Sequence, residues 1–94
     1  MIVHYSERAR ETILDYYENY VVCDNFPDNT DMKQRANNYS RISTGLLWLD
    51  FETLQQKSYQ KDNRNFIDID DICAVEYQIK SNNIELIIMD IYFK

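Results

Sequence analysis

Apolar and polar residues follow a helical period in the first half of the chain. Residues 2–5 favour a short strand. Ser6 then has the character of a helix N-cap, and the acidic Glu7 lies in the first turn, where the helix dipole stabilises it. From Glu7 to about Val22 the apolar positions form one stripe, which predicts an amphipathic helix. The stripe consists of Ala9, Ile13, Tyr16, Tyr17, Tyr20 and Val21.

A second helix is predicted after a loop over 23–30, which contains Pro27 and several Asn and Asp residues. Asp31 and Gln34 fit a capping box, and the helical period continues from there to about Gln56. Gly45 interrupts this helix at a cost of about 1 kcal/mol relative to alanine, so it marks a kink or a close helix crossing. The apolar stripe consists of Met32, Ala36, Tyr39, Ile42, Leu46 and Leu49, and Trp48, Phe51 and Leu54 widen it towards its end.

The period changes to that of strands in the second half. Residues 57–65 are polar and favour a loop, and 66–69 favour a short strand. Residues 73–79 alternate between apolar and polar positions, which is typical of a strand with one buried face. This segment therefore predicts the first strand of a closing hairpin.

The last predicted strand is apolar on both of its faces. Ser81-Asn82-Asn83 fits a hairpin turn, because asparagine tolerates positive φ. Residues 84–93 then place Tyr92 on the same face as Ile88, so packing is one interpretation of this tyrosine. A strand that is apolar on both faces normally lies in the middle of a sheet under helices, and we expect that position here.

These elements predict one α+β domain over residues 1–94, a common domain size. It has a short N-terminal strand, two antiparallel helices and then a two- to three-stranded antiparallel hairpin region that completes one sheet. No apolar run is long enough for a membrane span, and the first residues do not have the character of a signal peptide. We therefore expect a cytoplasmic protein that does not bind a membrane.

The charge balance is acidic, with 16 Asp and Glu against 10 Lys and Arg and a net charge of −6. Proteins that bind nucleic-acid phosphates usually carry a basic patch, so this balance argues against direct nucleic-acid binding. Two interpretations of the basic residues on the predicted helices stay open: a local binding patch or solvated helix faces. These residues are Arg8, Arg10, Lys33, Arg35 and Arg41.

Candidate metal and cofactor ligands are few. His4 is the only histidine, and Cys23 and Cys73 have no neighbouring histidines, which excludes a zinc site of the usual spacing. An acidic group before the strands lacks the spacing of a calcium loop and is interpreted as solvated carboxylates. It comprises Asp62, Asp68, Asp70 and Asp71. The sequence thus indicates no cofactor and no metal.

The order of elements and several short segments resemble the RelE/ParE superfamily of small toxins from toxin–antitoxin pairs, also described as plasmid stabilisation proteins. His4-Tyr5-Ser6-Glu7-Arg8-Ala9 is similar to the family's entry from a strand into its first helix. Residues 13–20 are similar to that helix, which often carries a Leu/Ile-x-x-Tyr pattern, and 75–93 resemble the closing hairpin. The resemblance covers nearly the whole chain and implies a fold rather than one activity.

The resemblance implies two alternative activities. RelE-like members cut messenger RNA with basic residues and often a C-terminal tyrosine or histidine. Here Tyr92, Lys80 and Arg64 are the catalytic candidates, and Lys94 is a further candidate for binding. ParE-like members inhibit DNA gyrase without an obvious catalytic group. A cluster of several cations is missing from the closing strands, so the residues favour a toxin that binds a protein target over a ribonuclease.

The predicted partner is a cognate antitoxin or another protein. The alternative hypothesis is a non-enzymatic, acidic interaction module or inhibitor, of the kind that phages encode, which keeps the fold without the toxicity. Such a module would bind a basic protein in a salt-sensitive manner. An exposed edge strand and tyrosine-bearing helices are also compatible with a homodimer.

Overall fold

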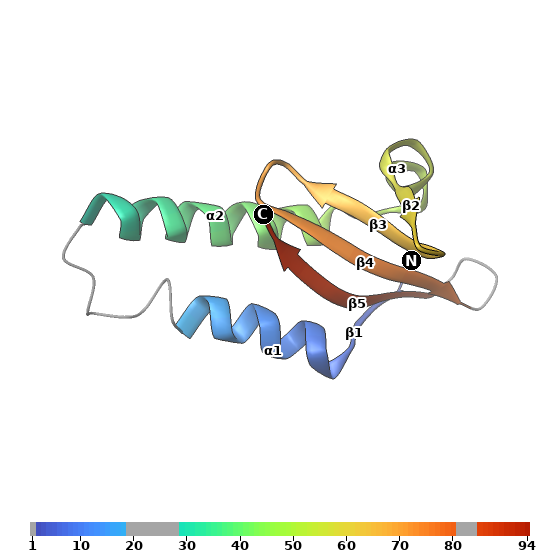
Figure 1. Cartoon of the computed structure of the whole chain (residues 1–94), viewed down its shortest axis with the longest axis horizontal. Coiled ribbons are helices and arrows are strands. Elements are labelled where there is room, and N and C mark those ends of the chain that lie inside the picture. The colour runs from blue at the N-terminus through green and yellow to red at the C-terminus, as the bar shows by residue number, and fades with distance from the viewer. Residues whose placement is uncertain (1, 19–28, 81–84) are drawn as a thin grey trace.

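The computed structural model describes residues 2–18, 29–80 and 85–94, without the side chains of 29–33. Within these residues, three helices and one five-stranded sheet form an α+β fold (Figure 1). The elements are β1 (Ile2–Tyr5), α1 (Glu7–Tyr16), α2 (Asn29–Leu47), α3 (Phe51–Lys57), β2 (Tyr59–Lys61), β3 (Arg64–Ile69), β4 (Cys73–Lys80) and β5 (Glu85–Phe93). The α+β class is confirmed, whereas the predicted arrangement of two helices followed by a hairpin region is wrong.

The strands form one mixed sheet in the order β1-β5-β4-β3-β2. The last strand, β5, is interior as predicted, since it pairs with β1 in parallel and with β4 in antiparallel orientation. The hairpin turn predicted at 81–83 and the end of the first helix near Val22 lie outside the described residues. No helix within the described part of the chain is long and apolar enough to cross a membrane.

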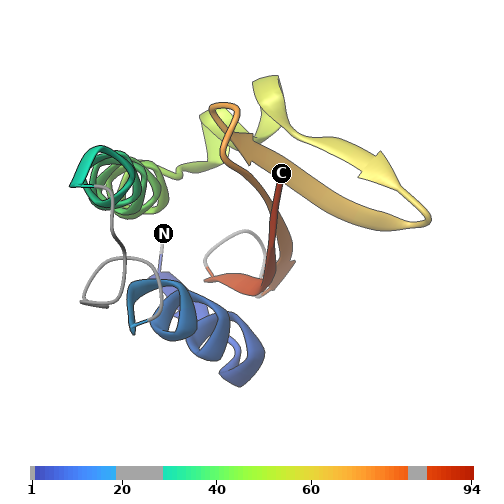
Figure 2. The same ribbon diagram turned by 60° about the vertical axis from the view of Figure 1, so that its left-hand side comes forward.

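The core lies between the sheet and the two longer helices. Figure 2 shows α1 and α2 on the same side of the curved sheet, while none of the described helices covers the other face of β3 and β4. Apolar side chains of α2 meet those that point to this side from β3, β4 and β5. The central members are Ile42, Leu46, Leu49, Ile67, Ile69, Val75, Leu86, Ile88 and Ile91.

A β-bulge in β5 changes which side chains face the core. The pairs Glu76–Asp90 and Tyr77–Ile88 leave Met89 without an opposite residue. Such a bulge reverses the alternation of the strand beyond it. Tyr92 therefore lies on the opposite face from Ile88, which corrects the predicted shared face.

Ser6 anchors α1 at this bulge. Its hydroxyl accepts a hydrogen bond from the backbone N–H of Ala9 at 3.0 Å, so it is the predicted N-cap. The same hydroxyl donates to the carbonyl of Met89 at 2.6 Å. One side chain thus fixes both the beginning of α1 and its position beside β5.

The predicted second helix is in fact two helices. α2 begins at Asn29, before the predicted capping box, and ends at Leu47 rather than continuing to Gln56. Asp50 then adopts an extended conformation, and its carboxylate accepts a hydrogen bond from the backbone N–H of Thr53 at 2.7 Å. This N-cap begins α3 and makes the change of direction that brings Leu54 into the core.

The polar segment predicted as a loop contains a hairpin. β2 pairs with β3, and the two residues between them, Asp62 and Asn63, both have positive φ. Two central residues of this kind form the type I′ turn that suits the twist of a two-residue hairpin. Because β2 is exposed along its whole length, it lacks the apolar alternation that would have revealed it.

Candidate functional site

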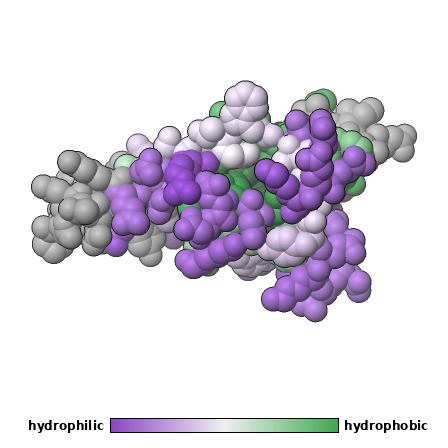
Figure 3. Space-filling view, turned by 90° about the horizontal axis from the view of Figure 1, so that it is seen from above, coloured by the Kyte–Doolittle hydropathy of each residue, from purple (hydrophilic) through white to green (hydrophobic). Residues whose placement is uncertain are grey.

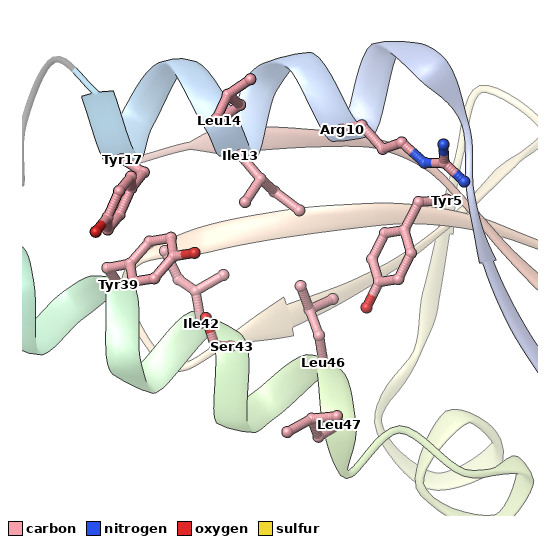
Figure 4. A pocket seen from close by; sticks show the side chains of 10 residues that line it. All are labelled: Tyr5, Arg10, Ile13, Leu14, Tyr17, Tyr39, Ile42, Ser43, Leu46 and Leu47. Carbon is pink, nitrogen blue, oxygen red and sulfur yellow. The ribbon is translucent and has the colours of Figure 1, made fainter.

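An apolar groove with a volume of about 440 Å³ lies between α1 and α2 (Figure 4). Its base is formed by the buried Ile42 and Leu46 and by the half-buried Ile13. The complete lining is Tyr5, Arg10, Ile13, Leu14, Tyr17, Tyr39, Ile42, Ser43, Leu46 and Leu47. We refer to this surface as the helical groove.

Both rims of the helical groove carry leucines that are left in water. Leu14 of α1 is 55% exposed and Leu47 of α2 is 83% exposed. Both leucines lie outside the core because other apolar residues already fill the core-facing side of each helix. Each helix therefore has an apolar face wider than the core needs.

The two ends of the helical groove differ. At one end the rings of Tyr17 and Tyr39 lie 5.0 Å apart and tilted, so they join the two helices. At the other end lie Tyr5 and Arg10, as Figure 4 shows. Burial raises the pKa of the Tyr5 hydroxyl, which therefore stays protonated at neutral pH. Arg10 forms no ion pair with any other described residue.

A second surface lies on the sheet face that no helix covers. Three aromatic rings form a row across β2, β3 and β5: Tyr59 and Phe66 are stacked at 5.7 Å, and Phe66 and Tyr92 are tilted at 6.0 Å. The guanidinium of Arg64 lies 5.5 Å from the centre of the Phe66 ring, within cation–π range. Around them is a hollow of about 270 Å³, for which the small side chain of Ala74 leaves room. We refer to this surface as the open face.

Glu76 on the open face is bonded to two of its neighbours. The Tyr92 hydroxyl donates a hydrogen bond to Oε1 of Glu76 at 2.9 Å, and Nη1 of Arg64 approaches the same oxygen at 3.5 Å. The bond to the carboxylate raises the pKa of Tyr92, so the hydroxyl holds its proton at neutral pH. The open face therefore places a carboxylate, a cation and a phenol around one point.

A parallel pair of bonds surrounds Asp68. Its carboxylate accepts a hydrogen bond from Nζ of Lys94 at 2.8 Å and another from the Tyr59 hydroxyl at 2.7 Å. Lys94 contributes most to holding the pKa of Asp68 below its ordinary value, and the Tyr59 bond adds to it. The same bond raises the pKa of Tyr59. Lys94, a predicted binding residue, is thus already held by a carboxylate.

The open face brings together two of the three catalytic candidates. Arg64 and Tyr92 both line its hollow, whereas Lys80 lies at the end of β4 opposite Glu85 and does not line it. Glu76 was not among the predicted site residues. Its position could have been inferred, because the alternation of β4 points it to the side opposite the apolar core residues.

The basic residues predicted as a patch do not form one surface within the described part of the chain. Arg8 pairs with the buried Asp90 at 2.8 Å, and Arg41 pairs with Asp70 at 3.0 Å, on different sides of the molecule. Arg10 lines the helical groove. Arg35 is half-buried on α2, and the side chain of Lys33 lies outside the described residues. Figure 3 shows a side of the molecule on which hydrophilic residues predominate.

The remaining candidates for nucleophilic or metal chemistry are the two cysteines and His4. Cys73 is a free, buried cysteine, and burial raises the pKa of its thiol to about 11, so it is a poor nucleophile. Cys23 lies outside the described residues. His4 lies on β1, with Nε2 3.8 Å from Glu85. No three His, Cys, Asp or Glu side chains gather as a metal site within 2–18, 29–80 and 85–94.

No protein-family model, curated protein or solved structure matches this chain.

Proposed function

We propose that this chain acts by binding another protein through the helical groove, as a toxin-like component of a toxin–antitoxin pair. The observation that carries the proposal is the pair of leucines, Leu14 and Leu47, exposed on either rim of an apolar hollow. Burying a leucine side chain completely is worth about 1.5–3 kcal/mol, so a partner that covers both gains a substantial part of its affinity there. Grooves of this kind accept amphipathic helices in many complexes.

The resemblance to RelE/ParE toxins supports the toxin-like role, together with the order of β1, α1 and the following helix. The alternative is an acidic interaction module that binds through the same groove and is harmless to the cell. Both alternatives require a protein partner, and they differ only in what binding does to growth. The growth of a bacterial culture therefore separates them.

The test is the controlled induction of the chain and of two variants in a bacterial culture. Leu47→Gln changes the rim of the helical groove, and Trp48→Gln is a matched control, since Trp48 is 75% exposed but does not line the groove. We expect growth arrest with the natural chain and with Trp48→Gln, and relief of arrest with Leu47→Gln at equal protein level. Arrest that Leu47→Gln leaves unchanged would rule out the groove as the toxic surface. Unimpaired growth with the natural chain would leave the harmless module.

RNA cleavage is a second candidate, and the convergence on Glu76 favours it. Cleavage through the 2′-hydroxyl requires a base, a cation for the developing negative charge and an acid for the leaving oxygen. Glu76, Arg64 and the protonated Tyr92 would fill these roles in that order. The acidic residues close by, Asp62 and Asp68, repel a phosphate and weigh against this reading.

This second candidate has its own measurement, the integrity of messenger RNA in the induced culture. If the open face cuts RNA, Tyr92→Phe and Arg64→Ala will each slow cleavage by tenfold or more, while Lys80→Ala, outside the hollow, will not. Cleavage that proceeds equally in all three variants would exclude the assignment.

A further inference from the structure

We infer that the helical groove binds an amphipathic helix of a partner protein that carries lysine or arginine along one edge, an inference that rests on the proposed protein-binding function. The apolar part of the argument concerns the shape of the groove. From Tyr39 to Leu47 the α2 rim spans about 12 Å, at 1.5 Å per helical residue. That length accommodates two turns of a helix, which would present apolar side chains at positions i, i+3 or i+4, and i+7.

The α1 rim adds a charge pattern. Glu7 and Glu11 lie one turn apart on α1, and Glu18 follows two residues after its end. Glu11 and Glu18 line a shallow hollow that shares Leu14 with the helical groove and also contains Arg8, which is paired with Asp90. All three glutamates are exposed, and none of them forms an ion pair with another described residue. Glu7 and Glu11 are separated by about 6 Å along the helix axis. Carboxylates thus lie beside the α1 rim of the groove, on the outer side of Leu14.

The α2 rim is neutral where its side chains are described. Ala36, Ser40 and Thr44 occupy the positions that border the groove residues on the solvent side of α2. The charge pattern is therefore one-sided, which predicts a partner helix with basic residues on one edge only. The chain's net charge of −6 further favours the approach of a basic partner over an acidic one.

Arg10 is the exception, as a cation inside the end of the groove beside Tyr5. A helix carries partial negative charge at its C-terminus, so Arg10 is placed to interact with that end of the partner helix. The apolar base then fixes the depth of the helix, the three glutamates fix which edge faces α1, and Arg10 fixes its direction.

The test is a selection from displayed 18-residue peptides with a fixed amphipathic pattern of apolar residues and random residues elsewhere. The target is the purified full chain. We expect enrichment of Lys and Arg over Asp and Glu along one edge of the apolar stripe. Binding of the selected peptides should fall at least tenfold with Leu47→Gln and should change less than twofold with the control Trp48→Gln.

A charge exchange tests the edge directly. In the variant Glu11→Lys/Glu18→Lys, affinity for a selected peptide should fall at least tenfold at low salt, and a version of that peptide with its basic edge changed to Glu should regain it. Enriched peptides without a basic edge, an unaltered affinity after the exchange, or no peptide sensitive to Leu47→Gln would each overturn the inference. The protein-binding function fails separately, in the growth assay, if Leu47→Gln leaves arrest unchanged.

Discussion

Gly45→Ala is predicted to destabilise this protein, although the same change in the interior of a helix normally stabilises it. Alanine in place of glycine favours the helix by about 1 kcal/mol. A Cβ atom at position 45, however, would lie 2.9 Å from Cγ2 and 3.3 Å from Cδ1 of Ile69 on β3. The glycine thus marks a close crossing, as one of the two predictions had it, but the element crossed is a strand and not a helix.

The magnitude follows from whether Ile69 can move. Its side chain is buried in the core and, because it is β-branched, has little rotamer freedom. Overpacking of this kind costs about 1–3 kcal/mol, which exceeds the gain in helix propensity. We therefore expect Gly45→Ala to lower the free energy of unfolding by about 1 kcal/mol. The three atoms nearest to the added Cβ all belong to Ile69.

Urea unfolding monitored by far-UV circular dichroism measures this in two backgrounds. In the natural chain Gly45→Ala should destabilise, whereas in an Ile69→Ala background, where the three contacting atoms are gone, it should stabilise by about 1 kcal/mol. The coupling between the two sites is then about 2 kcal/mol. The reasoning is refuted if Gly45→Ala stabilises the natural chain or has the same effect in both backgrounds.

Three further predictions concern single side chains. Ser6→Ala removes both the N-cap of α1 and its bond to the sheet and should cost about 1–2 kcal/mol in urea unfolding, whereas an unchanged midpoint would show that neither bond matters. The pKa of Asp68 is lowered chiefly by Lys94, so this pair stabilises above the ordinary Asp pKa of 3.8 and its contribution is lost as the pH falls through the lower folded value. For this exposed pair the loss is at most about 1 kcal/mol. In the variant Lys94→Met, where the Tyr59 bond still lowers the pKa of Asp68, the loss of stability on acidification should be smaller. In a Cys23→Ser variant, Cys73 should react with a thiol reagent at pH 8 about a hundredfold more slowly in the folded than in the unfolded chain, because its folded pKa is about 11, and equal rates would show that the thiol is accessible.

Local signals in the sequence were sufficient where they acted within a few residues. Ser6 followed by Glu7 predicted the beginning of α1 correctly, and the two apolar faces of 85–93 predicted an interior strand. The break after Leu47 was missed because Leu49, Phe51 and Leu54 continue the helical period beyond it. Hydrophobic periodicity predicts which residues are buried but not where a helix ends. Two short helices at an angle can bury the same residues as one long helix.

The two candidate surfaces were predictable to different degrees. Tyr92 and Arg64 were already candidates from the sequence. The bulge at Met89, however, places Tyr92 on the same face as Glu76, and the pattern of apolar residues does not indicate the extra residue of a bulge. The helical groove needed the relative placement of two helices far apart in the sequence. The available signals were Leu14 and Leu47, apolar residues beside the two core stripes rather than in them.

The ion pairs of Arg64 and Lys94 on the open face, compared with the exposed leucines of the helical groove, favour the groove as the binding surface. A phosphate on the open face that engaged Arg64 or Lys94 would have to draw Arg64 from Glu76 or Lys94 from Asp68, leaving a carboxylate beside a new negative charge. Binding in the groove breaks no such ion pair. A partner that covers Leu47 replaces water with apolar atoms, which contributes about 25 cal/mol of binding free energy per Å² buried. An anion that engages Arg64 or Lys94 therefore meets an opposing interaction, whereas an apolar ligand in the groove meets none. Binding of an anion to the open face should accordingly respond far more strongly to substitution of Glu76 and Asp68 than binding to the groove.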